Sequence, residues 1–289
     1  IMKNKKMPYK RYQIGPVFRD EPIQGNRARQ FISCDADIIG SSVKDEAEIL
    51  AMAKGILDRL KIKATTFVNN RKLLNEILEG FKIKNKEQVI RIIDKLDKLP
   101  EKEIAKELQK FKAEKILNIF KKDEKFFEKY KSYEEIKELR KYCNIYGVKF
   151  IFQPFLARGL SYYDGNIFEI KSDIKETIFG GGSYTFNGIK AVGFGVSIER
   201  LSIVSQIKPE KEKCLIISLN QDKKAIELEQ KLREKDKIIS IYYGKPSKAL
   251  DYANAYNFNK VIFVGEKEVK SKKFKIKDMK SGKENLLKI

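Results

Sequence analysis

The chain has 289 residues, of which 42% are hydrophobic and 35% charged, and its formal net charge is +21. This length and composition predict a globular protein of two or three domains. The charge favours contact with a polyanion such as nucleic acid, although 11 Arg and therefore 50 Lys among 61 basic residues also fit a general bias towards Lys.

The sequence contains no His, which excludes imidazole acid–base catalysis, His-containing metal sites and Ser–His–Asp triads. Its three Cys are far apart and form no CxxC pair, so we expect neither a disulfide framework nor a zinc site. No apolar run reaches the length of a membrane span. These features predict a protein of the reducing cytoplasm.

Residues 9–40 predict an antiparallel hairpin whose strands are separated by a polar loop over Pro22–Arg29. That loop is too long for a tight turn, which suggests a further role. Four of the scarce arginines fall in the first 30 residues, namely Arg11, Arg19, Arg27 and Arg29. Because the guanidinium fork grips phosphate or carboxylate in a way that Lys cannot, the cluster indicates an anion site. For any single arginine, a solvated surface charge is an equally good interpretation.

Helical spacing predicts a helix over Lys44–Leu60, then a strand over Ala64–Asn69 and a second helix over Asn70–Phe81. Arg71 is interpreted as a charge at the start of that second helix. From residue 85 to 147 the chain is rich in Lys and Glu with helical periodicity, and Pro100 is expected to separate two helices.

Strand character resumes at Val148–Leu156 and runs into LARGLSYYDGNIFEI, with Arg158 at the strand end and a turn at Gly165. Neighbouring residues of a strand face opposite sides, so at most one of Tyr162 and Tyr163 is expected to line a given pocket.

A run of three glycines precedes AVGFGVSIERL, in which Gly193 and Gly195 leave one face of a strand nearly bare. A flat ligand can lie on such a face, although a Gly-rich strand taken alone is more often a packing feature. From residue 212 onwards, strands and helices alternate as βαβαβ and two short strands follow. That region has no G-x-G-x-x-G, which argues against dinucleotide binding.

Three of these stretches resemble motifs of one enzyme family. RYQIGPVFRDEP followed by RQF and CDADIIG resembles motif 2 of class II aminoacyl-tRNA synthetases in its histidyl-tRNA synthetase form. RGLSYYDGNIFE resembles the histidine-specific motif, and AVGFGVSIERL resembles motif 3. The resemblance implies an α+β fold with four regions: the motif 2 half of an antiparallel-sheet catalytic core at 1–84, a helical insertion at 85–147, the second core half at 148–208 and an α/β anticodon-binding domain at 212–289.

The resemblance also implies an ATP-dependent ligase that activates histidine and transfers it to tRNA(His), acting as a homodimer. Mg²⁺ is expected only as the companion of ATP, with no protein-bound metal. The implied catalytic residues are Arg158 and Arg19. The implied ATP-binding residues are Arg19, Glu21, Arg27, Phe31 and Arg200. The implied histidine-binding residues are Ser33, Asp37, Arg158, Tyr162 and Tyr163. The residues implied to reach tRNA are Arg27 and Arg29.

The chain departs from the family pattern in four respects. Ser33 stands where the family has a Gln that contacts the substrate α-amino group, Ser161 replaces an Asp, and Ser183 interrupts GGGRYD. Motif 1 is not found, so we expect a fragment that is inactive in isolation. Two rivals remain: a silent paralogue, such as the regulatory subunit of ATP phosphoribosyltransferase, and a non-enzymatic tRNA- or RNA-binding protein.

Overall fold

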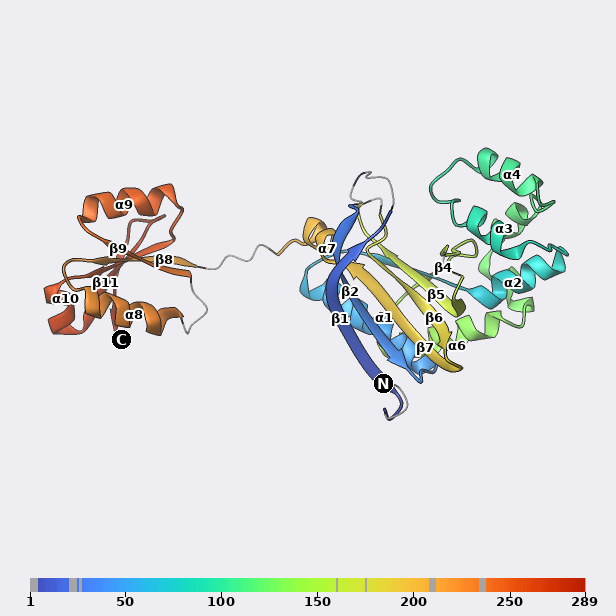
Figure 1. Ribbon diagram of the computed structural model, residues 1–289, viewed down its shortest axis with the longest axis horizontal. Coiled ribbons are helices and arrows are strands. Elements are labelled where there is room, and N and C mark those ends of the chain that lie inside the picture. The colour runs from blue at the N-terminus through green and yellow to red at the C-terminus, as the bar shows by residue number, and fades with distance from the viewer. Residues whose placement is uncertain are drawn as a thin grey trace. The chain divides into compact units, whose positions relative to one another are not determined.

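The computed structural model describes residues 5–20, 25, 28–159, 161–174, 176–207, 212–233 and 238–288. The chain forms two compact units, residues 1–207 and 208–289 (Figure 1).

The first unit is built on a seven-stranded sheet with the strand order β1-β2-β7-β6-β5-β3-β4. Every neighbouring pair is antiparallel except β3 and β4. The strands are β1 (Tyr9–Phe18), β2 (Gln30–Ile39), β3 (Thr65–Asn70), β4 (Ile151–Phe152), β5 (Tyr163–Lys171), β6 (Phe179–Phe186) and β7 (Ile189–Ser197). The predicted hairpin is confirmed, with Val17 opposite Phe31 beside its loop.

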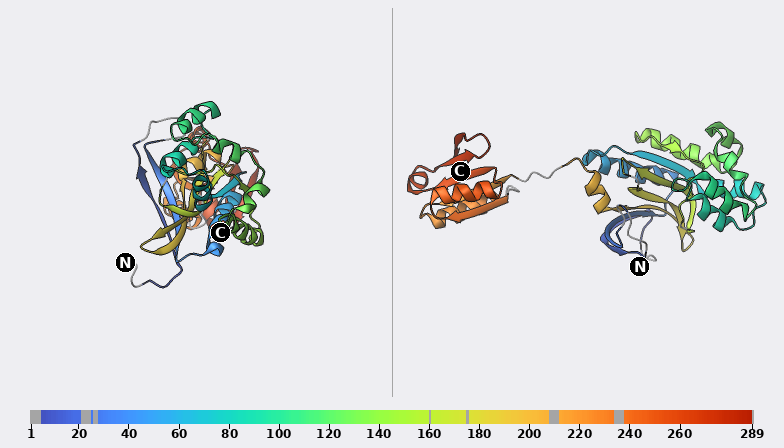
Figure 2. Two further views of the ribbon diagram at one scale, coloured as in Figure 1. Left: turned by 90° about the vertical axis from the view of Figure 1, so that its right-hand side faces the viewer. Right: turned by 90° about the horizontal axis from the view of Figure 1, so that it is seen from above.

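Helices α1 (Val43–Arg59) and α6 (Tyr133–Ile145) pack together on one face of this sheet (Figure 2). Helix α1 begins where Asp45 accepts a hydrogen bond of 2.8 Å from the backbone N–H of Ser42, which satisfies a donor of the first turn. Ala36 and Ile38 of β2 join the buried cluster on the helical side. Since side chains alternate along a strand, Asp35 and Asp37 face the other side.

Most of the remaining helices of this unit lie beside β3 and β4 at one end of the sheet, whereas the last one, α7, follows β7 and contacts β2 (Figure 1). They are α2 (Arg71–Gly80), α3 (Lys86–Ile93), α4 (Glu101–Gln109), α5 (Ile116–Phe120), the 3-10 helix η2 (Glu124–Lys129) and α7 (Ile198–Val204). Pro100 is the residue before α4, but α3 already ends at Ile93, so a turn of several residues separates the two helices. The buried side chains of α3 to α6 belong to the same hydrophobic cluster as the sheet.

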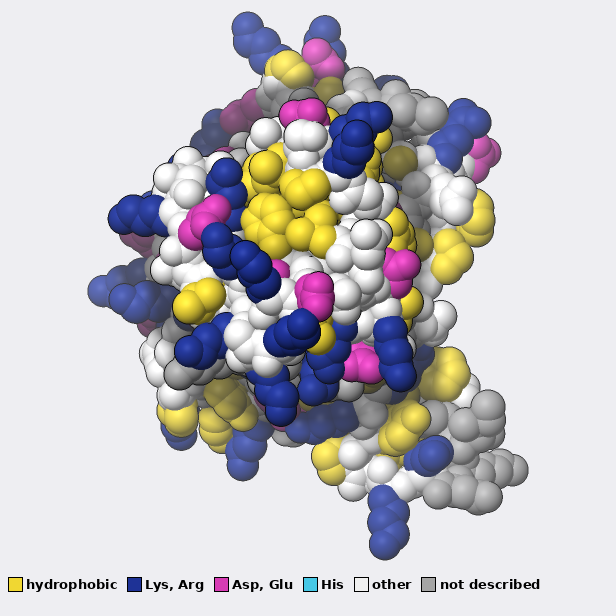
Figure 3. Space-filling model, turned by 90° about the vertical axis from the view of Figure 1, so that its left-hand side faces the viewer, with side chains coloured by type: hydrophobic (Ala, Val, Ile, Leu, Met, Phe, Trp, Pro, Cys, Tyr) yellow, Lys and Arg dark blue, Asp and Glu magenta, His cyan; other side chains and the backbone are white. Residues whose placement is uncertain are grey.

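The second unit has a five-stranded sheet with the order β12-β11-β10-β8-β9, in which β9, β8 and β10 are parallel. Its elements are β8 (Lys213–Ser218), α8 (Asp222–Arg233), β9 (Ile238–Tyr243), α9 (Pro246–Ala255), β10 (Lys260–Val264), α10 (Glu266–Ser271), β11 (Lys273–Asp278) and β12 (Glu284–Lys288). Helix α8 covers one face and α9 the other, each over its own apolar cluster. On the face drawn in Figure 3, Lys and Arg side chains are spread widely and form no single stripe.

Candidate active site

A cleft of about 1150 Å³ lies on the sheet face opposite α1 and α6. Its walls come from β1, β2, β5, β6 and β7, from the first turn of α7, from the loop before β5 and from the turn after α3. Segments from both halves of the first unit therefore meet around one cavity.

The floor of the cleft is a row of residues aligned by strand register. Gln13, Asp35, Gly195, Gly180 and Glu169 lie opposite one another on β1, β2, β7, β6 and β5. The two glycines leave room for their neighbours, since a Cβ at Gly195 would stand 2.8 Å from the Asp35 carboxylate. The bare strand face that the sequence predicted is thus bordered by charged groups from other elements.

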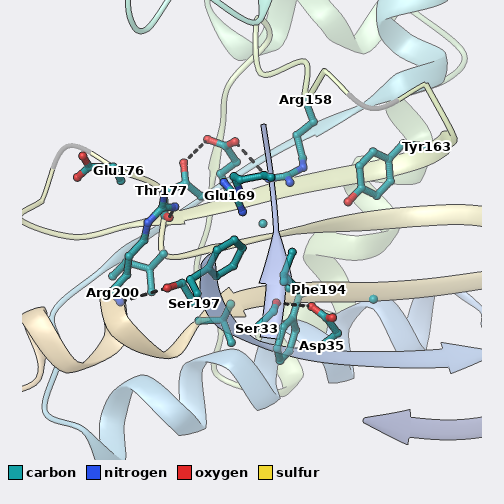
Figure 4. Close-up of a pocket in the computed structure, with 18 of the residues that line it drawn as sticks. Ser33, Asp35, Arg158, Tyr163, Glu169, Glu176, Thr177, Phe194, Ser197 and Arg200 are labelled. Atoms are coloured by element: carbon teal, nitrogen blue, oxygen red, sulfur yellow. Dashed lines mark hydrogen bonds and ion pairs between the residues drawn. The ribbon is translucent and has the colours of Figure 1, made fainter. Parts of the chain in front are cut away.

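Arg158 lies directly over Gly180 (Figure 4). Its Nη1 donates to Oε1 of Glu169 at 3.2 Å, and Oε2 of the same carboxylate accepts from the Thr177 hydroxyl at 2.9 Å. The backbone of Arg158 is in the left-handed region, with φ of 39°. Within the described chain, its buried Nε has no hydrogen-bond partner. A strained backbone and an unsatisfied donor in a cleft are typical of a binding residue.

Arg158 belongs to a loop, because the strand predicted at Val148–Leu156 is reduced to the two residues of β4. Buried side chains from the end of β3 and the start of α2 hold this loop. Asn69 donates to the carbonyl oxygens of Pro154 and Leu156 at 2.9 and 2.8 Å. Arg71 reaches the Ala157 carbonyl at 3.4 Å and pairs with both oxygens of Glu87, at 2.8 and 2.7 Å. Arg71 is the first residue of α2, as predicted, but its side chain is buried and also supports the loop that carries Arg158.

Two further arginines line the same cleft. The Arg19 guanidinium lies 4.1 Å from the ring centroid of Phe31, as in a cation–π contact. Arg200, in the first turn of α7, donates from Nη1 to the Thr177 carbonyl at 2.8 Å. Its neighbour Glu199 accepts from the Ile32 backbone at 2.7 Å, which ties α7 to β2. The structure therefore brings Arg19, Arg158 and Arg200 to one cavity from three distant parts of the sequence.

Both tyrosines of the YY pair line the cleft, which contradicts the expectation that only one would. Strand β5 begins at Tyr163, so Tyr162 lies before the strand and the alternation of sides does not apply. Their rings are 4.5 Å apart, and the Tyr162 hydroxyl donates to that of Tyr163 at 3.3 Å. The turn predicted at Gly165 is also wrong, because this residue lies within β5, beside an irregularity in its pairing with β6.

Asp37 belongs to a cluster of polar side chains, of which it alone was a predicted site residue. Its Oδ1 accepts from the Tyr184 hydroxyl at 2.8 Å, and its Oδ2 is 3.7 Å from the Arg11 guanidinium. Burial raises the pKa of Asp37, against the lowering effects of Tyr184 and Arg11. Tyr184 and Arg11 were not among the expected site residues, although Arg11 belonged to the early arginine cluster.

Two of the three serines that depart from the family pattern, Ser33 and Ser183, lie on opposite faces of the sheet. Ser33 is buried at the cleft and donates to Asp35 Oδ1 at 2.8 Å. Ser183 points to the helical side and donates to the half-buried Glu46 of α1 at 2.6 Å. Burial raises the pKa of Glu46 to about 7.

Glu21 and Arg27 lie outside the described residues. Arg29 is described and exposed, its carbonyl accepts from the Arg19 backbone at 2.9 Å, and its side chain does not line the cleft.

The turn after α3 contributes Asp97, Lys98 and Leu99 to the wall of the cleft. Lys171 joins this turn to the floor, because its ammonium lies 2.7 Å from Asp97 and 3.3 Å from Glu169. An unbroken set of ion pairs thus leads from the turn after α3 to Arg158. No pattern in the sequence indicated this connection.

Among the described residues, no group of three or more Cys, Asp or Glu side chains is placed to hold a metal ion. None of the described helices is long and apolar enough to span a membrane.

An antiparallel sheet that carries its cleft opposite two long helices is the catalytic fold of class II aminoacyl-tRNA synthetases. A crystal structure described as histidyl-tRNA synthetase from Nostoc sp. PCC 7120 superposes with a TM-score of 0.83, over 99% of this chain and 77% of that chain. Its sequence identity is 22%, so this likeness concerns the fold.

Sequence comparisons then identify the family. Residues 2–201 match the histidyl-tRNA synthetase family model, and residues 213–289 match the anticodon binding domain model. Histidine–tRNA ligase of Clostridium acetobutylicum is 33% identical over 98% of this chain and 76% of that protein. Histidine–tRNA ligase 1 of Bacillus cereus is 33% identical over 97% of this chain and 75% of that protein. The chain belongs to the histidyl-tRNA synthetase family, which is a family of aminoacyl-tRNA synthetases.

Proposed function

We propose that the protein is a histidine–tRNA ligase, which joins histidine to the AMP part of ATP and then transfers the histidyl group to tRNA(His). The observation that carries this proposal is the convergence of Arg19, Arg158 and Arg200 on one cleft. The relatives are named as histidine–tRNA ligases, and the cleft of this chain contains cationic groups suited to the substrates of such an enzyme.

In the first step, an oxygen of the histidine carboxylate attacks the α-phosphorus of ATP. A carboxylate–phosphorus bond forms, the bond to the bridging oxygen of the β-phosphate breaks, and pyrophosphate leaves with the accompanying Mg²⁺. Negative charge builds up on the α-phosphate, and fixed cations in a partly dry cleft stabilise it. We assign Arg19 to the α-phosphate, Arg158 to the attacking carboxylate and α-phosphate, and Arg200 to the far end of the triphosphate.

In the second step, a ribose hydroxyl at the 3′ end of the tRNA attacks the histidyl carbonyl. A carbon–oxygen ester bond forms, AMP leaves with the electrons of the mixed-anhydride bond, and the proton of the ribose hydroxyl passes to the phosphate of the departing AMP. We propose that Arg27 and Arg29 assist ATP binding or reach the acceptor end of the tRNA, and that Glu21 lies near the adenine.

Phe31 is the proposed stacking partner of the adenine ring. Arg19 covers this ring at 4.1 Å, so the two roles are linked. When Arg19 turns to the α-phosphate, a face of the ring becomes available for the base.

The imidazole of histidine is proposed to contact Asp37 and Tyr163, with Tyr162 and Ser33 nearby. A site that pairs both ring nitrogens rejects amino acids that would leave these buried groups unpaired. Tyr163 is buried, which increases this penalty.

Residues 212–289 are proposed to bind the anticodon, and the helices of residues 85–147 to form an insertion domain that approaches the acceptor arm. We also propose that the protein assembles as a homodimer and is located in the cytoplasm.

The test is amino-acid-dependent exchange of pyrophosphate into ATP, run on the chain with a motif 1 segment restored at its N-terminus, with the twenty standard amino acids compared. We expect exchange with histidine alone. Arg158→Ala should lose at least about a hundredfold in rate, the effect of removing one stabilising group from a developing anion. The matched control is Arg59→Ala, which removes an exposed arginine outside the cleft. No exchange with any amino acid, together with retained tRNA binding, would support the RNA-binding or silent-paralogue alternatives.

A further inference from the structure

Asp35 differs from the other described carboxylates of the cleft floor. Glu169 has Arg158, Lys171 and Thr177 around it, and Asp37 has Arg11 and Tyr184. Within the described chain, Asp35 receives one hydrogen bond, from the Ser33 hydroxyl, and takes part in no ion pair.

Gln13 lies opposite Asp35 on β1, but its side-chain oxygen pairs with another residue. Its side-chain oxygen accepts from Nη2 of Arg11 at 2.8 Å, and the Nη1 of the same guanidinium faces Asp37. An anion without a cationic partner in a partly dry site is costly unless a ligand supplies the positive charge.

The floor between Asp35 and Arg158 is bare. Asp35 stands beside Gly195, Arg158 lies over Gly180, and the two glycines are directly opposite each other on β7 and β6. The Asp35 carboxylate leans towards Gly195 and the Arg158 guanidinium covers Gly180. Because adjacent strands are about 4.8 Å apart, these negative and positive groups face each other across roughly one strand spacing, and neither glycine places a side chain between them. Figure 4 shows Asp35 and Arg158 in the same cleft, and a negative and a positive group so placed suit the ammonium and carboxylate of an α-amino acid.

Asp37 lies two residues further along β2 on the same face, roughly 6.8 Å from Asp35 along the strand. It is next to Gly193 and the tyrosine group rather than to Gly195 and Gly180. A side chain that carries a basic ring can reach Asp37 while its ammonium stays at Asp35.

We propose that Asp35 binds the α-ammonium group of the amino-acid substrate, with Ser33 as the residue that orients its carboxylate. This inference rests on the proposed function and deepens it. The amide that the family pattern places at residue 33 is replaced here by a hydroxyl that holds a neighbouring carboxylate. Three contacts then define the substrate: the ammonium at Asp35, the carboxylate at Arg158 and the ring at Asp37. Three unlike contacts also distinguish L- from D-histidine.

The test compares two ligands that differ only in the amino group, L-histidinol and 4-(3-hydroxypropyl)imidazole, with dissociation constants measured by calorimetry. The wild-type protein should prefer histidinol by about tenfold to a hundredfold, the range expected for a hydrogen bond to a charged group. Asp35→Asn should reduce that preference to about threefold or less, since the neutral amide no longer attracts the ammonium. Asn also accepts the Ser33 hydroxyl, so folding should be preserved, and thermal unfolding checks it.

The matched control is Asp58→Asn, which removes an exposed carboxylate of α1 that pairs with Lys54. It should leave the preference unchanged. If Asp35→Asn weakens both ligands equally, Asp35 has only a structural role and the inference fails. If the wild-type protein binds neither histidinol nor histidine, the proposed function itself fails.

Discussion

The substitution Gly180→Ala tests the position of Arg158 without changing any side chain proposed to touch the substrate. A methyl group at residue 180 would stand 1.9 Å from Nη1 and 2.6 Å from Cζ of Arg158, whereas ordinary contact begins near 3.4 Å. The guanidinium must therefore retreat by about 1.5 Å, and its 3.2 Å contact with Glu169 will lengthen or break.

A displacement of about 1 Å in a catalytic group can cost on the order of a hundredfold in rate, so we expect a loss of at least that size in histidine-dependent exchange. Stability should fall by only about 1–2 kcal/mol, because the obstructing group is the mobile end of a side chain and one part-buried hydrogen bond is lost. The assay measures kcat for exchange and the melting temperature on the same samples.

Two other glycines provide the controls, one beside Gly180 on β6 and one on α1. A Cβ at Gly181 would meet the Gly193 carbonyl oxygen at 2.2 Å, where only the backbone could yield, so Gly181→Ala should prevent stable folding. A Cβ at Gly55 of α1 would meet nothing within 4 Å, so Gly55→Ala should keep the activity and add roughly 0.5–1 kcal/mol of stability. Wild-type exchange by Gly180→Ala would refute the placement of Arg158 over Gly180 during catalysis.

Three further predictions concern other parts of the first unit. The pKa of Glu46 is about 7 when folded and near 4.5 when exposed, so the folded state binds the extra proton and stability falls as the pH rises from about 4.5 to 7. Glu46→Gln should remove that slope and raise stability at pH 8 by roughly 3 kcal/mol, measured by urea unfolding; an unchanged slope would assign it to another group. Asp97→Asn should lower kcat for exchange several-fold while the dissociation constants of ATP and histidine change little, because Lys171 loses a partner and Glu169 holds Arg158 less firmly; equal loss in Asp58→Asn would show a general charge effect. Phe31→Leu should raise the KM for ATP by about tenfold, the value of one stacked base, and leave the KM for histidine unchanged; a larger effect on histidine would contradict the assignment.

Local patterns in the sequence predicted the elements of the fold well. The hairpin strands, the helix over Lys44–Leu60 and the βαβαβ order of the C-terminal unit all correspond to elements of the structure, because each depends on the periodicity of a short segment. Helix α10 was missed, since its six residues bury no side chain and leave no periodic signal.

The site was predicted where motifs carry its residues and missed where tertiary contacts create it. Arg19, Arg158 and Arg200 lie in recognisable motifs and do line one cleft. Tyr184 and Lys171 act through partners far away in the sequence, 147 residues in the case of Tyr184 and Asp37. No local pattern reports such a pair, so only coordinates reveal it.

The alignment of the floor residues across five strands also limits how this protein can change. Removing a single residue from the middle of β7 would exchange its two faces beyond that point, so that Val192 or Phe194 would turn towards the substrate side while glycines entered the apolar layer. One deletion would then abolish both catalysis and folding. Length variation within this sheet is therefore tolerable only in its connecting loops.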